Sequence, residues 1–393
     1  MIVYSERKGG IVMLYKKKLC ILILATLVFT VFGCRGGVEE EVESGKKYKR
    51  VTEKGLLSVA TPDKDNLWMV GYNGTILHSA DGGKTWQQQI SPLEIDLFDV
   101  FFTDDKNGWI VAKYGNAFHA TDGGEIWEKV ETGTRERLFS IYFTDDTFGW
   151  AVGSKGIIIN TADGGKTWHR QYYERIDDPF GEESGDDVDM ELYSLIHGKD
   201  GEKLTERKTL KHDDSTLNQV MFIDRNRGWI AGEFGLILHT RDGGRTWIQQ
   251  ECKELIPIVR EEEWEIQAPT LFGIYFETPL RGFATGLDSS IVITEDGGEH
   301  WKNFGTKTDL ALYSITVNGE NGCAVGSKGA YYYSRDGGKS WTQDEKSLNT
   351  NFWMRDVSFS DPLNGWIVGS MGTIIHTIDG GMNWITVSGI TID

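Results

Sequence analysis

The feature that most constrains the fold of this chain is a short motif that occurs seven times. An aspartate is followed by two glycines and, after two further residues, by a tryptophan. The aspartates are Asp81, Asp122, Asp163, Asp242, Asp296, Asp336 and Asp379, and the tryptophans are Trp86, Trp127, Trp168, Trp247, Trp301, Trp341 and Trp384. Recurrence at a period of about forty residues indicates a repeat architecture in which each copy is one structural unit. We therefore read the motif first as a structural element and not as seven active sites.

Each copy of the motif ends a unit with a constant order of apolar runs and turns. In the second unit, the apolar run Leu97–Phe102 is followed by turn residues at 104–108 and by further runs at 109–112, 117–121 and 127–130. Four short strands and three turns thus fill about forty residues. Seven such units predict an all-β fold, a closed seven-bladed β-propeller with four antiparallel strands per blade.

The repeated aspartate stands where the chain reverses between the third and fourth strands. A carboxylate there can accept hydrogen bonds from its own turn, and the two glycines can adopt positive φ without steric cost. The first glycine of a phosphate-binding loop is missing, because His78 stands five residues before Gly83. The sequence therefore predicts a structural fastener, with no catalytic residue, cofactor or metal in the motif.

The chain before the repeats has the pattern of an export signal. Lys16, Lys17 and Lys18 precede an apolar run at 19–32, and Cys34 follows. This pattern predicts a lipoprotein in which Cys34 becomes the lipid-bearing first residue, and the true start is expected at Met13. The predicted division is a signal peptide at 1–33, a charged tether at 34–53, a propeller at 54–388 with inserts at 169–216 and 248–270, and a tail at 389–393.

Charge limits the classes of partner. The formal net charge is −18, which repels nucleic acid and anionic lipid. We expect protein partners, membrane contact through the lipid anchor alone, no nucleic acid, and a glycan only as a less favoured ligand. Cys252 and Cys323 belong to different repeats, and whether they form a disulfide is left open.

Two inserts interrupt the otherwise short connections between blades. They follow consecutive blades and emerge on the same rim, where long loops on a rigid scaffold commonly carry function. We expect the recognition surface on this rim, over blades three to five. The candidate partner-binding residues are Tyr172, Tyr173, Ile256, Ile258 and Trp264. The alternatives are a disordered acidic loop at 174–191 and a second insert whose apolar residues only cap the rim.

Two further features are open to structural explanations. His78, His119, His239 and His376 each lie three residues before a fastener aspartate. One histidine per blade is spread around a ring and cannot converge on one metal ion, so we expect packing positions. Ring closure is left open between two added strands, one at 47–52 and one at 388–393.

The motif and its unit resemble known repeats. The stretch Ser79 to Trp86 resembles the Asp-box, or BNR repeat, of sialidases and other propellers. The unit from Leu138 to Trp168 resembles the repeat of the photosystem II stability and assembly factor family, which are seven-bladed propellers. This resemblance extends over about residues 56–384 and implies a non-enzymatic protein that holds partner proteins, in some members as a lipoprotein. Phe283 and Cys323 replace expected tryptophans, and no arginine cluster matches the family's partner surface, so no binding residues are carried over.

The expected function is that of an exported, lipid-anchored scaffold that binds proteins or assists complex assembly at the cell envelope. Its expected location is extracytoplasmic, on the outer membrane or cell surface. One alternative is an Asp-box glycoside hydrolase, sialidase-like or glucan-cleaving, which two inward carboxylates facing one another would favour. A second alternative is a photosystem II assembly factor in a photosynthetic host.

Overall fold

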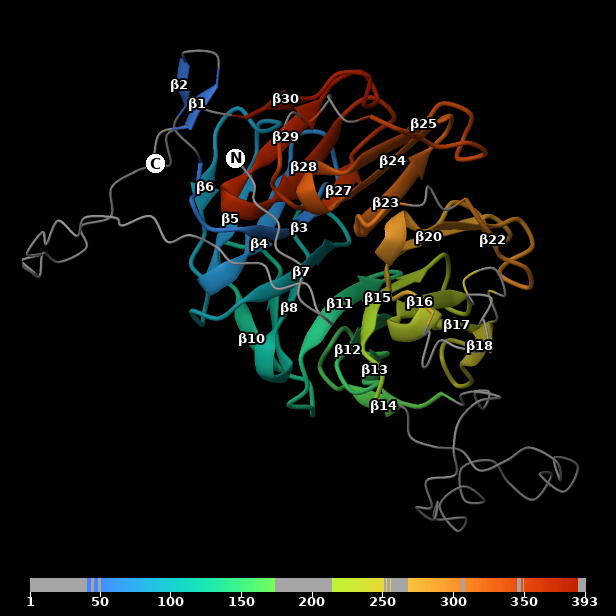
Figure 1. The fold of residues 1–393 in the computed structure, drawn as a ribbon. Helices are drawn as coiled ribbons and strands as arrows, with labels where there is room; N and C mark the ends of the chain where they lie inside the picture. Colours follow the sequence, from blue (N-terminus) through green and yellow to red (C-terminus); the bar gives the residue numbers. More distant parts are fainter. Residues whose placement is uncertain are drawn as a thin grey trace, which may run out of the picture.

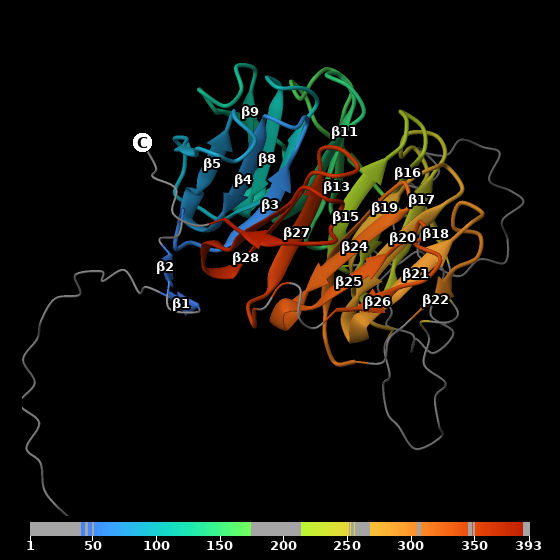
Figure 2. The same cartoon turned by 90° about the horizontal axis from the view of Figure 1, so that it is seen from above.

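The protein is a ring of seven sheets around a central axis, seen in the computed structural model in Figures 1 and 2. The structure describes residues 41–43, 46–48, 51–173, 214–250, 252, 255, 268–304, 308–344, 348 and 350–387. Each sheet has four strands, and neighbouring strands pair antiparallel. The predicted all-β, seven-bladed propeller with four strands per blade is therefore confirmed.

The four strands of each blade follow one another in the chain from the axis outward. The inner strands are β3 (Leu56–Ala60), β7 (Leu97–Phe102), β11 (Leu138–Phe143), β15 (Leu217–Phe222), β19 (Leu271–Phe276), β23 (Leu312–Asn318) and β27 (Met354–Phe359). The second strands are β4 (Leu67–Gly71), β8 (Gly108–Ala112), β12 (Gly149–Gly153), β16 (Gly228–Gly232), β20 (Gly282–Gly286), β24 (Asn321–Gly326) and β28 (Gly365–Gly369).

The third strands end at the repeated motif, and the outer strands follow it. The third strands are β5 (Ile76–Ser79), β9 (Asn116–Ala120), β13 (Ile158–Thr161), β17 (Ile237–Thr240), β21 (Ile291–Thr294), β25 (Tyr331–Ser334) and β29 (Ile374–Thr377). The outer strands are β6 (Gln87–Gln88), β10 (Glu128–Glu131), β14 (His169–Gln171), β18 (Ile248–Gln250), β22 (Lys302–Asn303), β26 (Thr342–Gln343) and β30 (Ile385–Thr386). The expected bounds in the second unit differ from these strands by a residue at several ends; Trp127, for example, precedes β10.

The turns of each blade divide between two rims. The turn between the first and second strands lies against the motif turn, and the Gly123 N–H donates to the Lys106 carbonyl at 3.0 Å. We call this the fastener rim. The turns between the second and third strands lie against the blade-to-blade connections, and the Gly74 N–H donates to the Ile95 carbonyl at 2.7 Å. We call this the connection rim.

The ring closes between blades seven and one without an exchanged strand among the described residues. Lys47 lies in β2 (Lys46–Tyr48), which pairs only with β1 (Glu41–Glu43), so the alternative of a closing strand at 47–52 is wrong in this part. Val51 instead packs into the seam with side chains of both blades. The alternative at 388–393 lies outside the described residues.

Tryptophans on the second strands join neighbouring blades. Trp109 of blade two stacks on Phe143 of blade three, with ring centroids 4.5 Å apart, and Gly165 of the blade-three fastener lies directly against it. In other blades the indole also donates to a fastener carbonyl, as from Trp68 to Gly123 at 3.2 Å. Each buried tryptophan removes about 150–250 Å² from water, a gross stabilisation of about 4–6 kcal/mol before entropy is counted. The fastener therefore holds adjacent blades together as well as its own hairpin.

A matched pair of glycine substitutions separates these two roles. Gly165 and Gly133 have nearly equal positive φ of 76° and 75°, but an added Cβ lies 2.0 Å from the Trp109 ring at Gly165 and meets nothing within 4 Å at Gly133. We expect Gly133→Ala to lower the free energy of unfolding by about 1 kcal/mol through backbone strain alone. Gly165→Ala should cost about 2–4 kcal/mol, because overpacking adds to that strain. Urea unfolding measures both, and equal losses would contradict the contact with the neighbouring blade.

Candidate functional site: the connection rim

The carboxylates of the fastener aspartates accept hydrogen bonds from residues of their own turns. The Asp81 carboxylate accepts from the Thr85 N–H at 2.8 Å, from the Thr85 hydroxyl at 2.7 Å and from the Ser79 hydroxyl at 2.9 Å. The Ser79 hydroxyl oxygen in turn accepts from the Gly83 N–H at 2.8 Å. Such bonds to the charged form lower the pKa of a carboxyl group.

The other fasteners repeat this arrangement with small changes. Hydroxyl and main-chain donors of the turn lower the pKa of Asp163 and of Asp336 to about 2. Asp122 has fewer partners, because Ala120 replaces the serine or threonine, and it accepts from the Ile126 N–H at 3.1 Å. The seven turns are distributed around the ring, one to a blade, so their carboxylates do not meet at a common site.

The four repeated histidines stack on second-strand tryptophans of the same blade. His119 lies 3.9 Å from Trp109 and His239 lies 4.6 Å from Trp229, as centroid distances between nearly parallel rings. His78 and His376 stack in the same way. Burial, followed by the nearby Arg241, lowers the pKa of His239 to about 4. The histidines thus act as flat, neutral packing groups.

Hydrogen bonds near the axis join one inner strand to the next. Seven junctions join adjacent inner strands around the ring. At six of them, the N–H of the fourth residue of one inner strand donates to the side chain of the third residue of the inner strand in the preceding blade. The pairs are Val59 to Asp356 (3.0 Å), Val100 to Ser58 (3.4 Å), Ile141 to Asp99 (2.9 Å), Val220 to Ser140 (3.3 Å), Ile274 to Gln219 (2.6 Å) and Val357 to Ser314 (3.4 Å). We call these six side chains the inner belt. At the remaining junction the third residue is Gly273, which has no side chain to accept.

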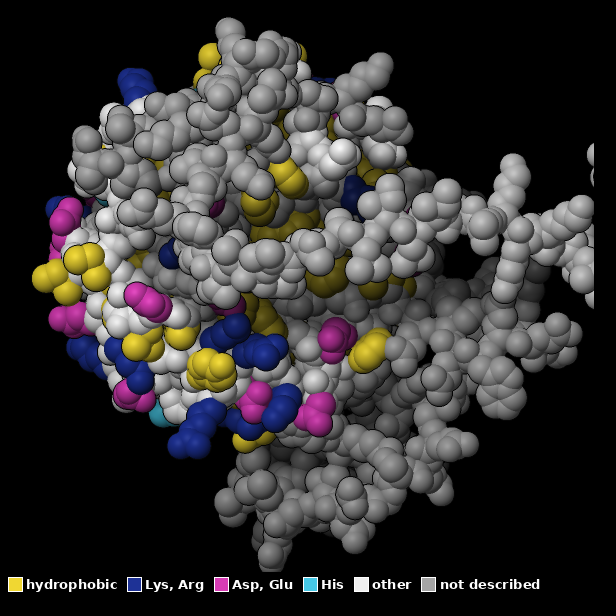
Figure 3. All heavy atoms as spheres, turned by 60° about the vertical axis from the view of Figure 1, so that its left-hand side comes forward, with side chains coloured by type: hydrophobic (Ala, Val, Ile, Leu, Met, Phe, Trp, Pro, Cys, Tyr) yellow, Lys and Arg dark blue, Asp and Glu magenta, His cyan; other side chains and the backbone are white. Residues whose placement is uncertain are grey.

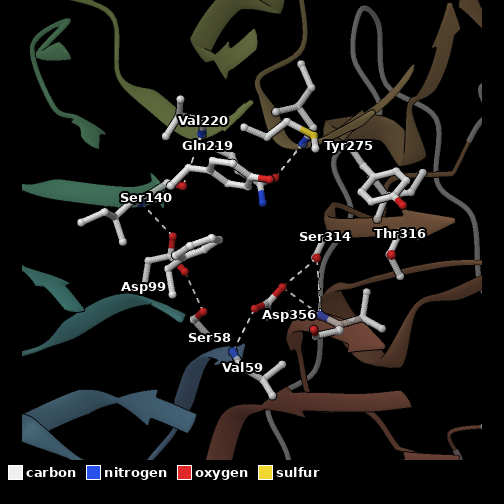
Figure 4. A pocket seen from close by; sticks show the side chains of 18 of the residues that line it. Ser58, Val59, Asp99, Ser140, Gln219, Val220, Tyr275, Ser314, Thr316 and Asp356 are labelled. Atoms are coloured by element: carbon white, nitrogen blue, oxygen red, sulfur yellow. Dashed lines mark hydrogen bonds between the residues drawn. The ribbon is translucent and has the colours of Figure 1, made fainter. Parts of the chain in front are cut away.

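The inner belt lines a central channel that contains two carboxylates. The channel has a volume of about 320 Å³, and Asp99 and Asp356 face it (Figure 4). Desolvation raises the pKa of Asp99 to about 6, and it raises that of Asp356 as well. Inward carboxylates of this kind are the feature that a glycosidase hypothesis requires.

The hydrogen bonds of these carboxylates favour a structural role. Asp99 accepts from the Ser58 hydroxyl at 2.7 Å and from the N–H groups of Val100 and Ile141, both at 2.9 Å. Asp356 is held in the same way by one serine hydroxyl and two main-chain N–H groups. A general acid or nucleophile must approach substrate, whereas both of these groups bridge neighbouring strands. This belt was not predicted, although the polar third residue of the inner strands was visible in the sequence.

The described ends of the two inserts meet at one turn of the connection rim. This turn is η4 (Glu233–Gly235) of blade four. At the end of the first insert, the Thr216 N–H donates to the Glu233 carboxylate at 2.7 Å, and the Glu233 N–H donates to the Thr216 carbonyl at 2.9 Å. At the end of the second insert, Ala268 lies against Gly235. Phe234 therefore stands between the attachment points of both inserts.

Phe234 belongs to a set of large residues in an unusual backbone conformation. Phe234, Tyr114 and Met371 have φ of 57°, 61° and 55°, in the left-handed region. Their side chains are 40%, 66% and 46% exposed. A bulky residue in this region costs about 1–3 kcal/mol. Asn73, Lys155, Asp288 and Lys328 have the same left-handed φ in the other four blades, so the angle belongs to the repeated turn and only the exposed large side chain is particular to these three. These positions were not among the predicted site residues, and the glycine that follows each of them is the available sequence signal.

The predicted partner-binding residues fall into two groups. Tyr172 is 59% exposed and lies under the Arg170 guanidinium, whereas Tyr173 packs against the core of blades three and four. Ile256, Ile258 and Trp264 lie outside the described residues, as does Cys34. Leu255 is buried against the core of blades four and five, which agrees with the capping alternative for this part of the insert.

Other candidate chemistry is limited in the described chain. Cys252 and Cys323 are both described, lie in different clusters and are not joined by a disulfide. Among the described residues no three His, Cys, Asp or Glu side chains are grouped to hold a metal ion. The same residues include no helix with the length and apolarity needed to cross a bilayer. On the face drawn in Figure 3, basic side chains are interspersed with acidic and hydrophobic ones.

Comparison with known proteins places the chain in a family. Four overlapping or adjacent segments, at 35–117, 86–176, 189–259 and 257–347, match the family model described as photosynthesis system II assembly factor YCF48. These segments cover well over half of the 393 residues. The chain belongs to this family. The photosystem II assembly lipoprotein Ycf48 of Synechococcus sp. (strain CC9902) is 32% identical over 97 residues, 22% of this chain and 29% of that protein. The match thus spans less than a third of that relative's length.

Solved structures of YCF48 family members have the same fold. A structure described as YCF48 bound to D1 peptide has a TM-score of 0.61 and 18% identity, over 84% of this chain and 93% of that one. YCF48 from Cyanidioschyzon merolae has a TM-score of 0.60 and 18% identity, over 85% and 98% of the two chains. An ancestral GH74 enzyme also has a TM-score of 0.60, with 13% identity, over 85% of this chain and 46% of its own. At these identities the likeness concerns the fold.

The histidine stacking predicts a defined pH dependence. The pKa of His239 is about 4 in the folded protein, against an ordinary value of 6.5. Its neutral form stabilises the fold fully above pH 6.5, and this contribution is lost as the pH falls from 6.5 to 4, because only the unfolded chain binds the proton. We expect His239→Asn to reduce the loss of stability between pH 7 and pH 5 by about 2 kcal/mol. Asn160 already occupies the equivalent position opposite Trp150 in blade three.

Urea unfolding of both proteins at pH 8, 7, 6 and 5 measures this effect. The pH 8 data are the control, since the two proteins should there differ only by the packing change. Equal slopes with pH would contradict a neutral, buried His239.

Proposed function

We propose that this chain is a non-catalytic scaffold that binds a partner polypeptide and assists assembly of a membrane protein complex. It is exported and held at the extracytoplasmic membrane surface, at the outer membrane or cell surface, by a lipid on Cys34. The proposed division is a signal peptide at 1–33, a tether at 34–53 and a propeller from 54 to 388, with a tail at 389–393. In a photosynthetic host the assembled complex is photosystem II. Family membership and the word lipoprotein in a relative's name support this proposal.

The observation that carries the proposal is the position of Phe234. An exposed aromatic ring is held in a strained conformation between the attachment points of the two inserts. All seven blades share this backbone angle, so what distinguishes Phe234 is an exposed aromatic side chain between the two inserts, a residue type enriched at protein interfaces. The tryptophans, fastener aspartates and inner belt are all engaged in holding the ring together, which leaves the connection rim over blades three to five for recognition.

A polypeptide is the favoured partner class. A family member has been solved with a D1 peptide, and aromatic residues such as Phe234 and Tyr172 are common anchors of protein interfaces. The glycosidase alternative rests on Asp99 and Asp356, whose hydrogen bonds to neighbouring strands favour a structural role. The net charge of −18 disfavours nucleic acid.

Replacing Phe234 by glycine separates recognition from stability. Phe234→Gly removes the ring and relieves the left-handed strain, so the melting temperature should stay the same or rise. Partner capture should fall at least tenfold, because an aromatic anchor is commonly worth 2 kcal/mol or more. Lys328→Gly in blade six is the matched control, since Lys328 has φ of 52° in the equivalent turn.

Affinity purification from host membranes, with the anchor intact, measures capture by quantitative mass spectrometry. Proteins that are lost with Phe234→Gly and kept with Lys328→Gly are the expected partners. An unchanged set of captured proteins in both variants would place recognition elsewhere.

A further inference from the structure

Blade seven carries an exposed apolar surface at its fastener rim. Leu363 lies in the turn between the first two strands, Ile378 and Met382 flank the fastener Asp379, and Ile385 lies in the outer strand. These four side chains are between 53% and 66% exposed. We call Leu363, Ile378, Met382 and Ile385 the blade-seven patch.

The other six blades serve as internal controls for this patch. The position of Met382 is charged in every other blade, as Lys84, Glu125, Lys166, Arg245, Glu299 and Lys339. In the other six blades, the position of Ile378 holds alanine, threonine or a charged residue. The position of Leu363 holds one other large apolar residue, Leu280, and the position of Ile385 holds one other, Ile248. Blade seven alone is apolar at all four. Repetition of the fold therefore does not explain the patch.

The fold brings the four side chains to one corner of the blade. The Gly380 N–H donates to the Leu363 carbonyl at 2.9 Å, which joins the two turns. The acidic groups of these turns are engaged by their own main chain, since Asp361 accepts from the Leu363 N–H at 2.8 Å and Asp379 accepts from the Asn383 N–H at 2.9 Å. The four apolar side chains are thus exposed beside the polar Asn383 and Thr386.

The patch lies on the side of the ring from which the N-terminal tether leaves. Val387, two residues after Ile385, packs against the cluster that contains Val51. In Figures 1 and 2 the β1–β2 hairpin lies beside blades one and seven. Glu41 and Tyr48 are paired across the β1–β2 hairpin, so the remaining residues at 35–40 and 49–50 supply a reach of about 26 Å, since an extended chain gains about 3.3 Å per residue. A strand of six residues spans only about 20 Å, so a lipid on Cys34 can reach either rim of blade seven.

We propose that the blade-seven patch docks on the lipid bilayer that holds the anchor at Cys34. The four side chains are aliphatic or thioether groups without hydrogen-bond donors, which suits the boundary between headgroups and acyl chains. Because the patch lies on the fastener rim, docking turns the connection rim and Phe234 away from the bilayer. This inference rests on the lipid anchoring in the proposed function.

A dye at Met382 tests the docking. The lipidated full chain is reconstituted into phosphatidylcholine vesicles after Met382→Cys and labelling with an environment-sensitive dye. Lys166→Cys at the same fastener position of blade three is the matched control, and the native Cys252 and Cys323 are buried. Brominated phosphatidylcholine should quench the dye at position 382 at least threefold more than the dye at position 166. Equal quenching at the two positions overturns the docking.

A second variant tests whether the patch itself causes the docking. Leu363→Asn, Ile378→Thr, Met382→Lys and Ile385→Thr are combined, because Asn226, Thr121, Lys84 and Thr342 occupy these positions in other blades. With the dye moved to Thr386→Cys, quenching should occur in the native background and be lost in the combined variant. If the dye is still quenched in the combined variant, the patch does not cause the docking. If the native protein forms a dimer in solution that the combined variant does not form, the patch binds a second copy of the chain instead of the bilayer.

The anchor is checked separately by the mass of the Cys34 peptide. An unmodified Cys34 refutes the anchoring and with it the docking. A lipidated Cys34 with equal quenching refutes the docking alone and leaves the proposed function in place.

Discussion

The ring depends on a repeated hydrogen bond between neighbouring inner strands. A main-chain N–H near the axis donates to the third side chain of the preceding blade, as from Ile141 to Asp99 at 2.9 Å. A buried N–H without a partner costs about 1–3 kcal/mol, so each junction favours one spacing and one register of adjacent blades. The same type of bond forms between Val59 of blade one and Asp356 of blade seven, at the seam where the first and last blades meet. This bond and the packing of Val51 hold the seam together among the described residues.

The fasteners complete this arrangement at the periphery. Belt bonds hold the blades at the axis, and the second-strand tryptophans hold them farther out at the next blade's fastener. Trp109 packs on Gly165, whereas Trp68 donates to the Gly123 carbonyl. The belt residues and the fastener residues therefore have structural roles. These include Asp99 and Asp356, whose position in the channel resembles that of catalytic carboxylates. The residues that are available for recognition are those that are exposed and do not hold the blades together. Phe234 on the connection rim and the blade-seven patch on the fastener rim are of this kind.

The sequence was sufficient for the fold and insufficient for much of the site. Seven copies of one motif specify strand order, strand number and blade number, because each element has its own local signal in glycine, aspartate or tryptophan. The inner belt needs the bulged register of the inner strand, which places Asp99 beside Ile141 of the next blade, and no periodic pattern encodes that register. Phe234 was not predicted because its position depends on how the ends of the two inserts fold against the turn of blade four. The predicted roles of Ile256, Ile258 and Trp264 stay predictions.

Amide hydrogen exchange tests the inner belt most directly. The Ile141 N–H should exchange in the native protein only through global unfolding, because its acceptor Asp99 is held on both sides by neighbouring strands. In Asp99→Ala, the exchange rate of the Ile141 amide should rise at least tenfold more than the fall in global stability accounts for. Other amides at the junction between blades two and three should show the same increase. Exchange at Ile141 that changes only in step with global stability would show that the belt does not hold the ring together.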